Sequence, residues 1–161
     1  MAHKSCFAMD WSDALASQTL RDRLTRDGVV LVRNVIDRAD ISRLAAIVEN
    51  HFAHAGRRFG LGQTQPDAGR FVTGLELAIT HPNIIALFEA ILGRGQPVFT
   101  GHCDIHRNML SGWHKDTGST YNAYLGDECF AADDCRIYKL GLYLQDQEDS
   151  HGLRGTNFMR Y

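Results

Sequence analysis

The sequence predicts an α+β or helix-decorated all-β domain, because helical and strand-like patterns occupy different parts of the chain. In the N-terminal half, apolar side chains recur at helical spacing in three segments. From Pro97 onward, polar and apolar residues alternate with the period of two that strands show. A length of 161 residues with 44% hydrophobic and 22% charged residues fits one domain over 1–161.

A helix followed by a strand is expected near the start of the chain. Residues 12–27 show a modest amphipathic pattern, with Ser12 in the N-cap position and Gly28 after the last turn. The β-branched and aliphatic run 29–32 follows, and it predicts a short buried strand.

Two more helices are expected before the alternating region. The first covers 40–53, and the second has Pro82 near its first turn and Gly93 just past its last. Between them, the glycine- and proline-containing stretch 57–69 predicts a loop, and 71–73 predicts a short strand. The apolar stripe of the 40–53 helix contains Ile41, Leu44, Ala45, Val48 and Phe52.

The alternating region predicts two strands separated by a polar loop at 119–134, which has the length of an active-site lid. The first strand has a wholly polar face, which points either to solvent or into a polar pocket. That face carries His102, Asp104, His106 and Asn108. The second strand, 135–145, is expected to place three leucines on one face: Leu140, Leu142 and Leu144.

The stretch 112–118, between the two strands, contains the pair His114-x-Asp116. Residues two apart on a strand point to the same face, so an imidazole and a carboxylate there can bind one metal ion. The pair would supply two ligands of a 2-His-1-carboxylate iron site. Eight His and fourteen Asp in 161 residues give roughly 0.7 chance occurrences (8 × 14/161), so the spacing alone does not identify the site.

Charge and hydropathy narrow the class of partner. Seventeen basic and nineteen acidic residues give a formal charge of −2, so the chain has no global field for nucleic acid or an anionic membrane. No run of about 18 apolar residues and no signal-peptide pattern is present, so we expect a cytoplasmic protein. A small molecule is the expected partner.

Several blocks in order carry a resemblance to a known family. They read Asp104-Ile-His-Arg-Asn-Met-Leu-Ser-Gly-Trp-His-Lys-Asp-Thr-Gly, then Tyr138-Lys-Leu-Gly-Leu-Tyr-Leu-Gln-Asp and Ser150-His-Gly-Leu. The opening Leu24-Thr-Arg-Asp-Gly-Val-Val-Leu-Val-Arg-Asn-Val-Ile-Asp fits as well. Together they resemble the phytanoyl-CoA dioxygenase family of non-haem iron, 2-oxoglutarate-dependent oxygenases.

The resemblance implies a double-stranded β-helix, the jelly-roll or cupin-like barrel, packed against N-terminal helices. It implies that His114 and Asp116 are iron ligands, with Fe(II) as cofactor and 2-oxoglutarate as cosubstrate. Asn108 corresponds to a position that contacts cosubstrate or substrate in some family members, and Lys139 is a candidate partner for a carboxylate. The expected reaction is hydroxylation of a small molecule at carbon, with release of succinate and carbon dioxide.

The family's third ligand, a second histidine, and its 2-oxoglutarate-binding arginine lie on later strands than those matched here. His151 is the only histidine after His114, and it matches the turn before those strands. We therefore expect a chain that lacks the C-terminal strands and holds about four or five of the roughly eight strands of a jelly roll. For the same reason we expect this chain by itself to convert 2-oxoglutarate to succinate slowly or not at all.

Two other functional readings stay open. One is a non-catalytic half-barrel that binds a partner or dimerises through exposed strand edges, because Leu140, Leu142 and Leu144 would then have no sheet to pack against. The other is a small cupin-type metal enzyme that uses His114, Asp116 and a histidine such as His102 or His106. Those last two histidines lie too far apart on a strand, roughly 13 Å, to bind the same metal ion.

Overall fold

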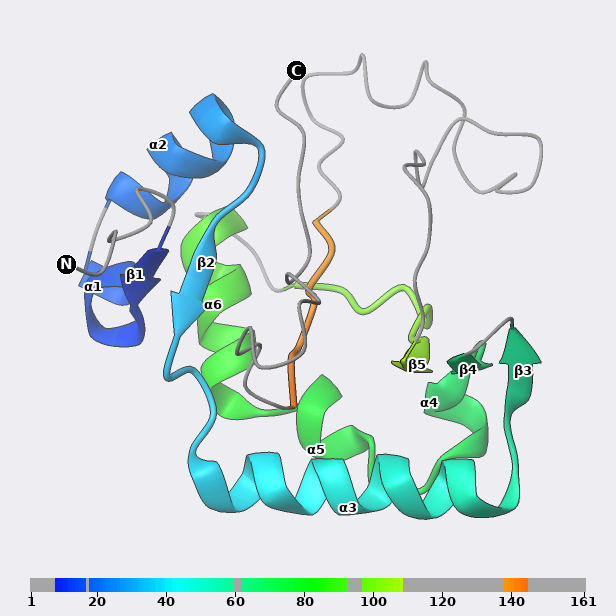
Figure 1. Cartoon of the computed structure of the whole chain (residues 1–161). Helices are drawn as coiled ribbons and strands as arrows, with labels where there is room; N and C mark the ends of the chain where they lie inside the picture. Colours follow the sequence, from blue (N-terminus) through cyan, green and yellow to red (C-terminus); the bar gives the residue numbers. More distant parts are fainter. Residues whose placement is uncertain (1–7, 17, 60–61, 93–96, 109–137, 145–161) are drawn as a thin grey trace, which may run out of the picture.

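The computed structural model describes residues 8–16, 18–59, 62–92, 97–108 and 138–144 (Figure 1). The helices in these ranges are α1 (Trp11–Ala16), α2 (Gln18–Asp27), α3 (Arg38–His54), α4 (Ala68–Phe71), α5 (Glu76–Ile79) and α6 (Pro82–Leu92). The strands are β1 (Ala8–Asp10), β2 (Leu31–Arg33), β3 (Arg57–Phe59), β4 (Gly62–Gln65) and β5 (Ile105–Arg107). Within these ranges every helix is too short or too polar to span a lipid bilayer.

The helix predicted over 12–27 is present as α1 and α2, on either side of position 17, which lies outside the described residues. Ser12 lies inside α1 rather than at its N-cap, so that prediction is wrong. Both helices bury apolar side chains, Ala14 in α1 and Leu20 in α2. The end of α2 is as predicted: Gly28 has φ +71°, and its N–H donates to the Leu24 carbonyl oxygen at 2.9 Å.

The strand predicted at 29–32 is shifted to β2, which pairs in parallel with β1 through the Met9–Val32 register. The expectation of full burial is wrong, because the side chain of Leu31 is 45% exposed. Val30 and Val32 are only partly buried, and they pack against one apolar cluster. Leu31 and Arg33, which share the other face of β2, are both exposed.

Helix α3 forms where its apolar stripe predicted a helix. Asp37 is the N-cap, and its carboxylate accepts the Asp40 N–H at 2.8 Å. The stripe is buried at Leu44, Val48 and Phe52. Figure 1 shows this long helix running along one side of the molecule, with α4, α5 and the strands β3 to β5 on its inner side.

The loop predicted over 57–69 is wrong, because β3 and β4 form an antiparallel hairpin in this stretch. Strand β4 has few residues of high strand propensity, and two features stabilise it instead. It pairs with β5 through Thr64 and His106, forming a three-stranded sheet. Its glutamines also bond to α3: Gln63 donates to the Phe52 carbonyl oxygen at 3.3 Å, and Gln65 bonds to the His51 ring at 3.1 Å.

The short strand predicted at 71–73 is also wrong. Phe71 is the last residue of α4, and its side chain is 65% exposed. Helix α6, in contrast, begins at Pro82 as predicted and ends at Leu92. Its buried residues are Ile84, Leu87 and Ile91.

Two apolar clusters form the interior. The α3 core consists of Ile36, Leu44, Val48, Phe52, Ala68, Val72, Leu75 and Ile84. The N-terminal core consists of Met9, Ala14, Leu20, Leu87 and Ile91. Because Phe88 of α6 packs against both, this helix joins the two clusters.

The segment 138–144 forms neither a helix nor a strand. Leu142 and Leu144 pack against the α3 core, and Leu140 is 45% exposed. The half-barrel hypothesis expects these leucines to have no sheet to pack against, and Leu142 and Leu144 instead pack against the α3 core. The helices thus supply an apolar surface in place of a second sheet.

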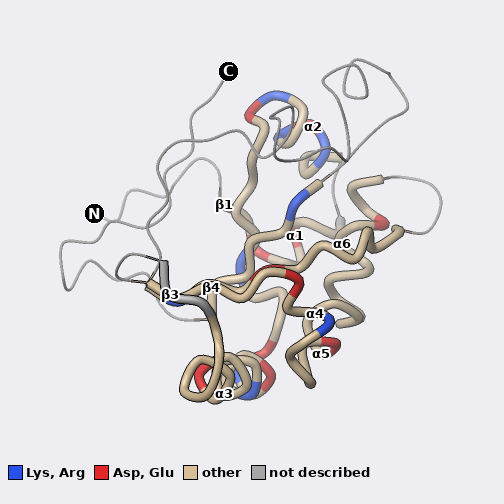
Figure 2. Tube along the Cα trace, turned by 90° about the vertical axis from the view of Figure 1, so that its right-hand side faces the viewer, with Lys and Arg blue, Asp and Glu red and all other residues tan. Residues whose placement is uncertain are grey.

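Short strands lie between the helices as well as after them, which differs from the predicted order of helices followed by strands. The described residues form helices and two small sheets without a closed barrel. The double-stranded β-helix stays a prediction, because 109–137 and 145–161 lie outside the described residues. Acidic and basic residues are interspersed along α2 and α3 (Figure 2).

Candidate metal centre

The two predicted iron ligands, His114 and Asp116, lie outside the described residues. The chemistry of the pair fits iron, since an imidazole nitrogen and a carboxylate oxygen are both donors that Fe(II) accepts. The two predicted cosubstrate contacts are described. Asn108 is exposed just after β5, and Lys139 is exposed on the segment 138–144.

Strand β5 leads into the motif, and its predicted alternation is confirmed. His102, Asp104, His106 and Asn108 are exposed, whereas Cys103, Ile105 and Arg107 between them are partly buried. The polar face therefore points away from the α3 core. Asn108 has φ +52°, a left-handed conformation that ends the strand and that asparagine tolerates better than most residues.

The polar groups on the exposed face are bonded to one another and to neighbouring elements. His102 Nε2 lies 3.2 Å from Asp104 Oδ2. The other oxygen of that carboxylate accepts the N–H of Asp67 at 3.0 Å. His106 Nδ1 lies 2.9 Å from the hydroxyl of Thr64 on β4. Asp104 thus joins β5 to the start of α4.

Among the residues that the structure describes, no three His, Cys, Asp or Glu side chains are grouped so that they could hold a metal ion. The alternative that pairs His102 or His106 with His114 and Asp116 stays a prediction, because two of its three ligands are not described.

The partly buried face of β5 carries a residue that the sequence analysis missed. The guanidinium of Arg107 donates to the carboxylate of Glu49 on α3 and to the side-chain oxygen of Gln63 on β4. It also lies over the ring of Phe52, 5.3 Å from the centroid. The available signal was an arginine at an inward position of an alternating strand, after Cys103 and Ile105.

Cys103 lies on the same inward face. Burial, and in second place the nearby charge of Asp104, raise the pKa of the Cys103 thiol and outweigh the effect of a backbone hydrogen bond with Gly69. A raised pKa keeps the sulfur protonated at neutral pH. The free thiol is therefore a weak nucleophile at neutral pH.

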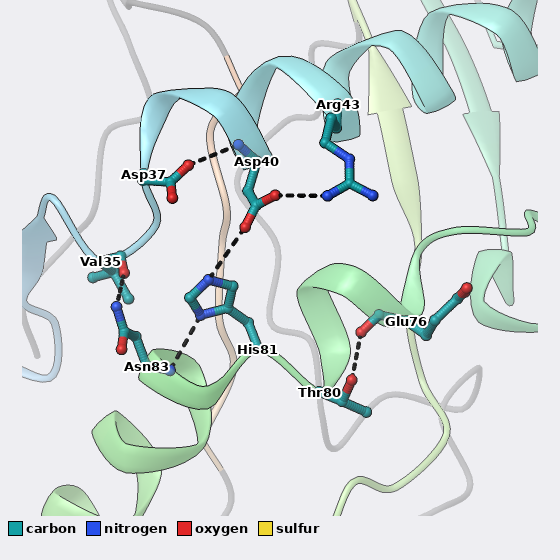
Figure 3. Close-up of polar contacts among 8 residues, drawn as sticks. All are labelled: Val35, Asp37, Asp40, Arg43, Glu76, Thr80, His81 and Asn83. Carbon is teal, nitrogen blue, oxygen red and sulfur yellow. Dashed lines mark hydrogen bonds and ion pairs between the residues drawn. The ribbon is translucent and has the colours of Figure 1, made fainter.

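A second polar cluster joins the starts of α3 and α6 (Figure 3). His81 Nδ1 accepts the N–H of Asn83 at 3.1 Å, and its Nε2 faces Asp40 at 3.9 Å. The Asn83 side chain donates to the Val35 carbonyl oxygen at 2.8 Å. Both nitrogens of this largely buried imidazole face protein atoms, so the cluster positions helices and is not a ligand site.

Comparison of the chain with protein-family models, with curated proteins and with solved structures gives no match.

Proposed function

We propose that the chain carries the metal centre of a non-haem iron, 2-oxoglutarate-dependent oxygenase of the phytanoyl-CoA dioxygenase type. The observation that supports it is the order of the sequence blocks: an alternating strand, then His114-x-Asp116, then the Tyr138 and Ser150 blocks. The structure adds one supporting observation. Exposed and partly buried residues alternate over 102–108, as expected of the strand that precedes the motif. The proposal includes the jelly-roll barrel and a cytoplasmic location.

In this proposal the imidazole of His114 and the carboxylate of Asp116 bind Fe(II) through nitrogen and oxygen donors. The bound iron, with 2-oxoglutarate and dioxygen, supplies the oxidising chemistry for hydroxylation at a carbon atom of a small molecule. Asn108 contributes an amide that can donate to or accept from the cosubstrate. Lys139 contributes an ammonium group for a carboxylate.

Metal binding tests the proposal directly. Purified chain is expected to bind Co(II), Mn(II) or Fe(II) weakly, because two protein ligands leave most coordination positions to water or cosubstrate. Calorimetry should show that His114→Ala and Asp116→Ala each abolish this binding. The matched control is His54→Ala, which removes an exposed imidazole that bonds to the Asn50 carbonyl oxygen within α3. Equal binding by the two motif variants and the wild type would remove these residues from the metal site.

Turnover is the second arm of this test. The resemblance identifies two iron ligands, whereas oxygen activation needs three ligands and an oriented cosubstrate. We therefore expect iron-dependent conversion of 2-oxoglutarate to succinate that is slow or absent with this chain alone. Rapid turnover that Asp116→Ala abolishes would mean that a third ligand is present in this sequence.

A binding or dimerisation module is the second candidate, and exposed apolar side chains favour it. Val98 is 85% exposed, and Phe99, Leu140 and Tyr143 are exposed as well. Such side chains mark interaction surfaces when they are contiguous. Light scattering tests the dimerisation form of this candidate: self-association that Val98→Asp weakens supports it, and a monomer at all concentrations contradicts it.

A further inference from the structure

We infer that His81 is a pH-dependent contact between α3 and α6: the neutral imidazole caps α6, and the protonated imidazole pairs with Asp40 of α3 instead. The inference is independent of the proposed function, because it uses neither the iron-ligand motif nor a metal ion.

His81 immediately precedes α6 and occupies its N-cap position. Its carbonyl oxygen accepts the N–H groups of Ile84 at 2.9 Å and Ile85 at 3.0 Å, and its Nδ1 accepts the Asn83 N–H at 3.1 Å. Pro82 has no N–H, so these three bonds satisfy every N–H between Pro82 and Ile85. The cap is complete only while Nδ1 has a free lone pair.

Protonation of the imidazole removes one bond of this cap. A neutral imidazole that accepts at Nδ1 carries its proton on Nε2, whereas an imidazolium carries a proton on each nitrogen and accepts at neither. The second proton would face the Asn83 N–H, at the end of the helix where the macrodipole is already positive. Because this contact is partly buried, the N–H left without an acceptor is costly.

Asp40 provides the protonated imidazole with another partner (Figure 3). Its Oδ2 lies 3.9 Å from Nε2 of His81, which is too far for a hydrogen bond and close enough for attraction between opposite charges. In Figure 3 the ring lies between Asp40 and Asn83, with one nitrogen toward each. A shift of the ring by about 1 Å toward Asp40 would bring Nε2 to bonding distance and draw Nδ1 away from Asn83. The two contacts therefore compete.

The other charged groups near the imidazole have partners of their own. Arg43 bonds to the second oxygen of the Asp40 carboxylate at 3.1 Å. The carboxylate of Asp37 accepts the Asp40 N–H, and that of Glu76 on α5 accepts a backbone N–H of its own turn. Helix α6 itself has no charged residue before Glu89. Of these groups, Asp40 is the one whose carboxylate faces Nε2.

Nuclear magnetic resonance of the full chain tests the exchange of partners between about pH 8 and about pH 5, the range in which histidines change charge. The amide proton signal of Asn83 should move as its hydrogen bond is lost, with the same midpoint as the imidazole signals of His81. His81→Asn keeps an acceptor at the cap without a group that titrates, so its Asn83 signal should not move. The matched control is His54→Asn, which removes an imidazole that bonds within α3 and should leave the Asn83 titration unchanged.

A double-mutant cycle tests the role of Asp40. Asp40→Asn removes the partner of the protonated imidazole. Lowering the pH from about 8 to about 5 should therefore raise the unfolding equilibrium constant of this variant about fivefold more than that of the wild type, the effect of one lost cap. In the His81→Asn background, Asp40→Asn should have the same effect at both pH values. Denaturant unfolding measures all four chains.

Three results would overturn the inference. The first is an Asn83 amide signal that stays in place while His81 is protonated, and the second is a His81 imidazole that stays neutral down to about pH 5. Both are measured on the wild type, so they decide even if a variant does not fold. The third is an effect of Asp40→Asn that is equal at the two pH values when His81 is present.

Discussion

The α3 core and the N-terminal core use their polar side chains in different ways. Around α2, side-chain bonds join residues close in sequence, such as Gln18 with Asp22 and Arg26 with Asp27. Around α3, local bonds such as Arg43 with Asp40 are accompanied by bonds between distant segments: Arg107 with Glu49, and Asn83 with the Val35 carbonyl.

The N-terminal region also has longer contacts, from Arg23 to the Ala8 carbonyl and from Asn34 to Asp10. The Asn34–Asp10 contact spans twenty-four residues, and the contact of Arg107 with Glu49 spans fifty-eight. The α3 region thus has polar contacts between distant segments in addition to its apolar burial.

The largest effect is expected from Phe52→Ala, which should lower the free energy of unfolding by about 3–5 kcal/mol. The ring is 3% exposed in the α3 core, and it also carries the guanidinium of Arg107. Its counterpart in the N-terminal core is Leu20→Ala, expected to cost about 2–5 kcal/mol through lost packing alone. Denaturant unfolding measures both.

Ile85→Ala is the control for these two variants, because that side chain is 37% exposed and should cost less than about 1 kcal/mol. A larger loss for Leu20→Ala than for Phe52→Ala would contradict the view that polar contacts add to the α3 core.

A smaller effect is expected from alanine at two glycines that lie one in each region. Gly56 has φ +98°, and an added Cβ would lie 2.6 Å from the Phe52 ring. Gly28 has φ +71°, with no atom within 4 Å of an added Cβ. Gly28→Ala should therefore cost the backbone strain alone, about 1–2 kcal/mol, and Gly56→Ala should cost more. Thermal melts compare them, and equal losses would mean that the Phe52 ring moves aside freely.

The smallest effect concerns pH and Cys103. Its folded-state pKa is raised from 9.0 by burial and by Asp104, so the unfolded chain loses this proton at a lower pH than the folded chain. The stabilisation that the protonated thiol gives the folded chain is complete below pH 9.0, the ordinary pKa of the thiol. It is lost as the pH rises through the pKa of the thiol in the folded chain. Stability measured above pH 9 should fall less steeply for Cys103→Ala than for the wild type. Parallel pH profiles for the two chains would show that the thiol titrates equally in both states.

The sequence predicted those elements whose pattern is local. The stripe of α3, the start of α6 at Pro82 and the alternation around β5 all reflect side chains that contact one surface at a fixed period. Strand β4 was missed because its residues have low strand propensity, and pairing with β5 and bonds to α3 stabilise it instead. Phe71 was misassigned because its strand propensity is outweighed by the helical turn of α4.

The residues of the candidate site also separate into those that a local sequence pattern identifies and those whose role depends on distant contacts. The sequence identified His114 and Asp116 through spacing and resemblance, and both lie outside the described residues. It placed Asn108 on the polar face of the alternating segment, and this residue is exposed just after β5, while its contact with a cosubstrate stays a prediction. It did not identify Arg107 as an anchor, because the partners Glu49 and Gln63 become neighbours only in the folded chain.

The pairing of β4 with β5 also has a consequence for folding kinetics. Thr64 and His106 are neighbours in the sheet, and α4, α5 and α6 lie between them in sequence. Closing this long loop costs chain entropy before any hydrogen bond of the sheet compensates for it. The helices, whose contacts are local, are therefore expected to form first and to bring the two strands together. The three-stranded sheet, from which the chain continues toward the motif, forms late.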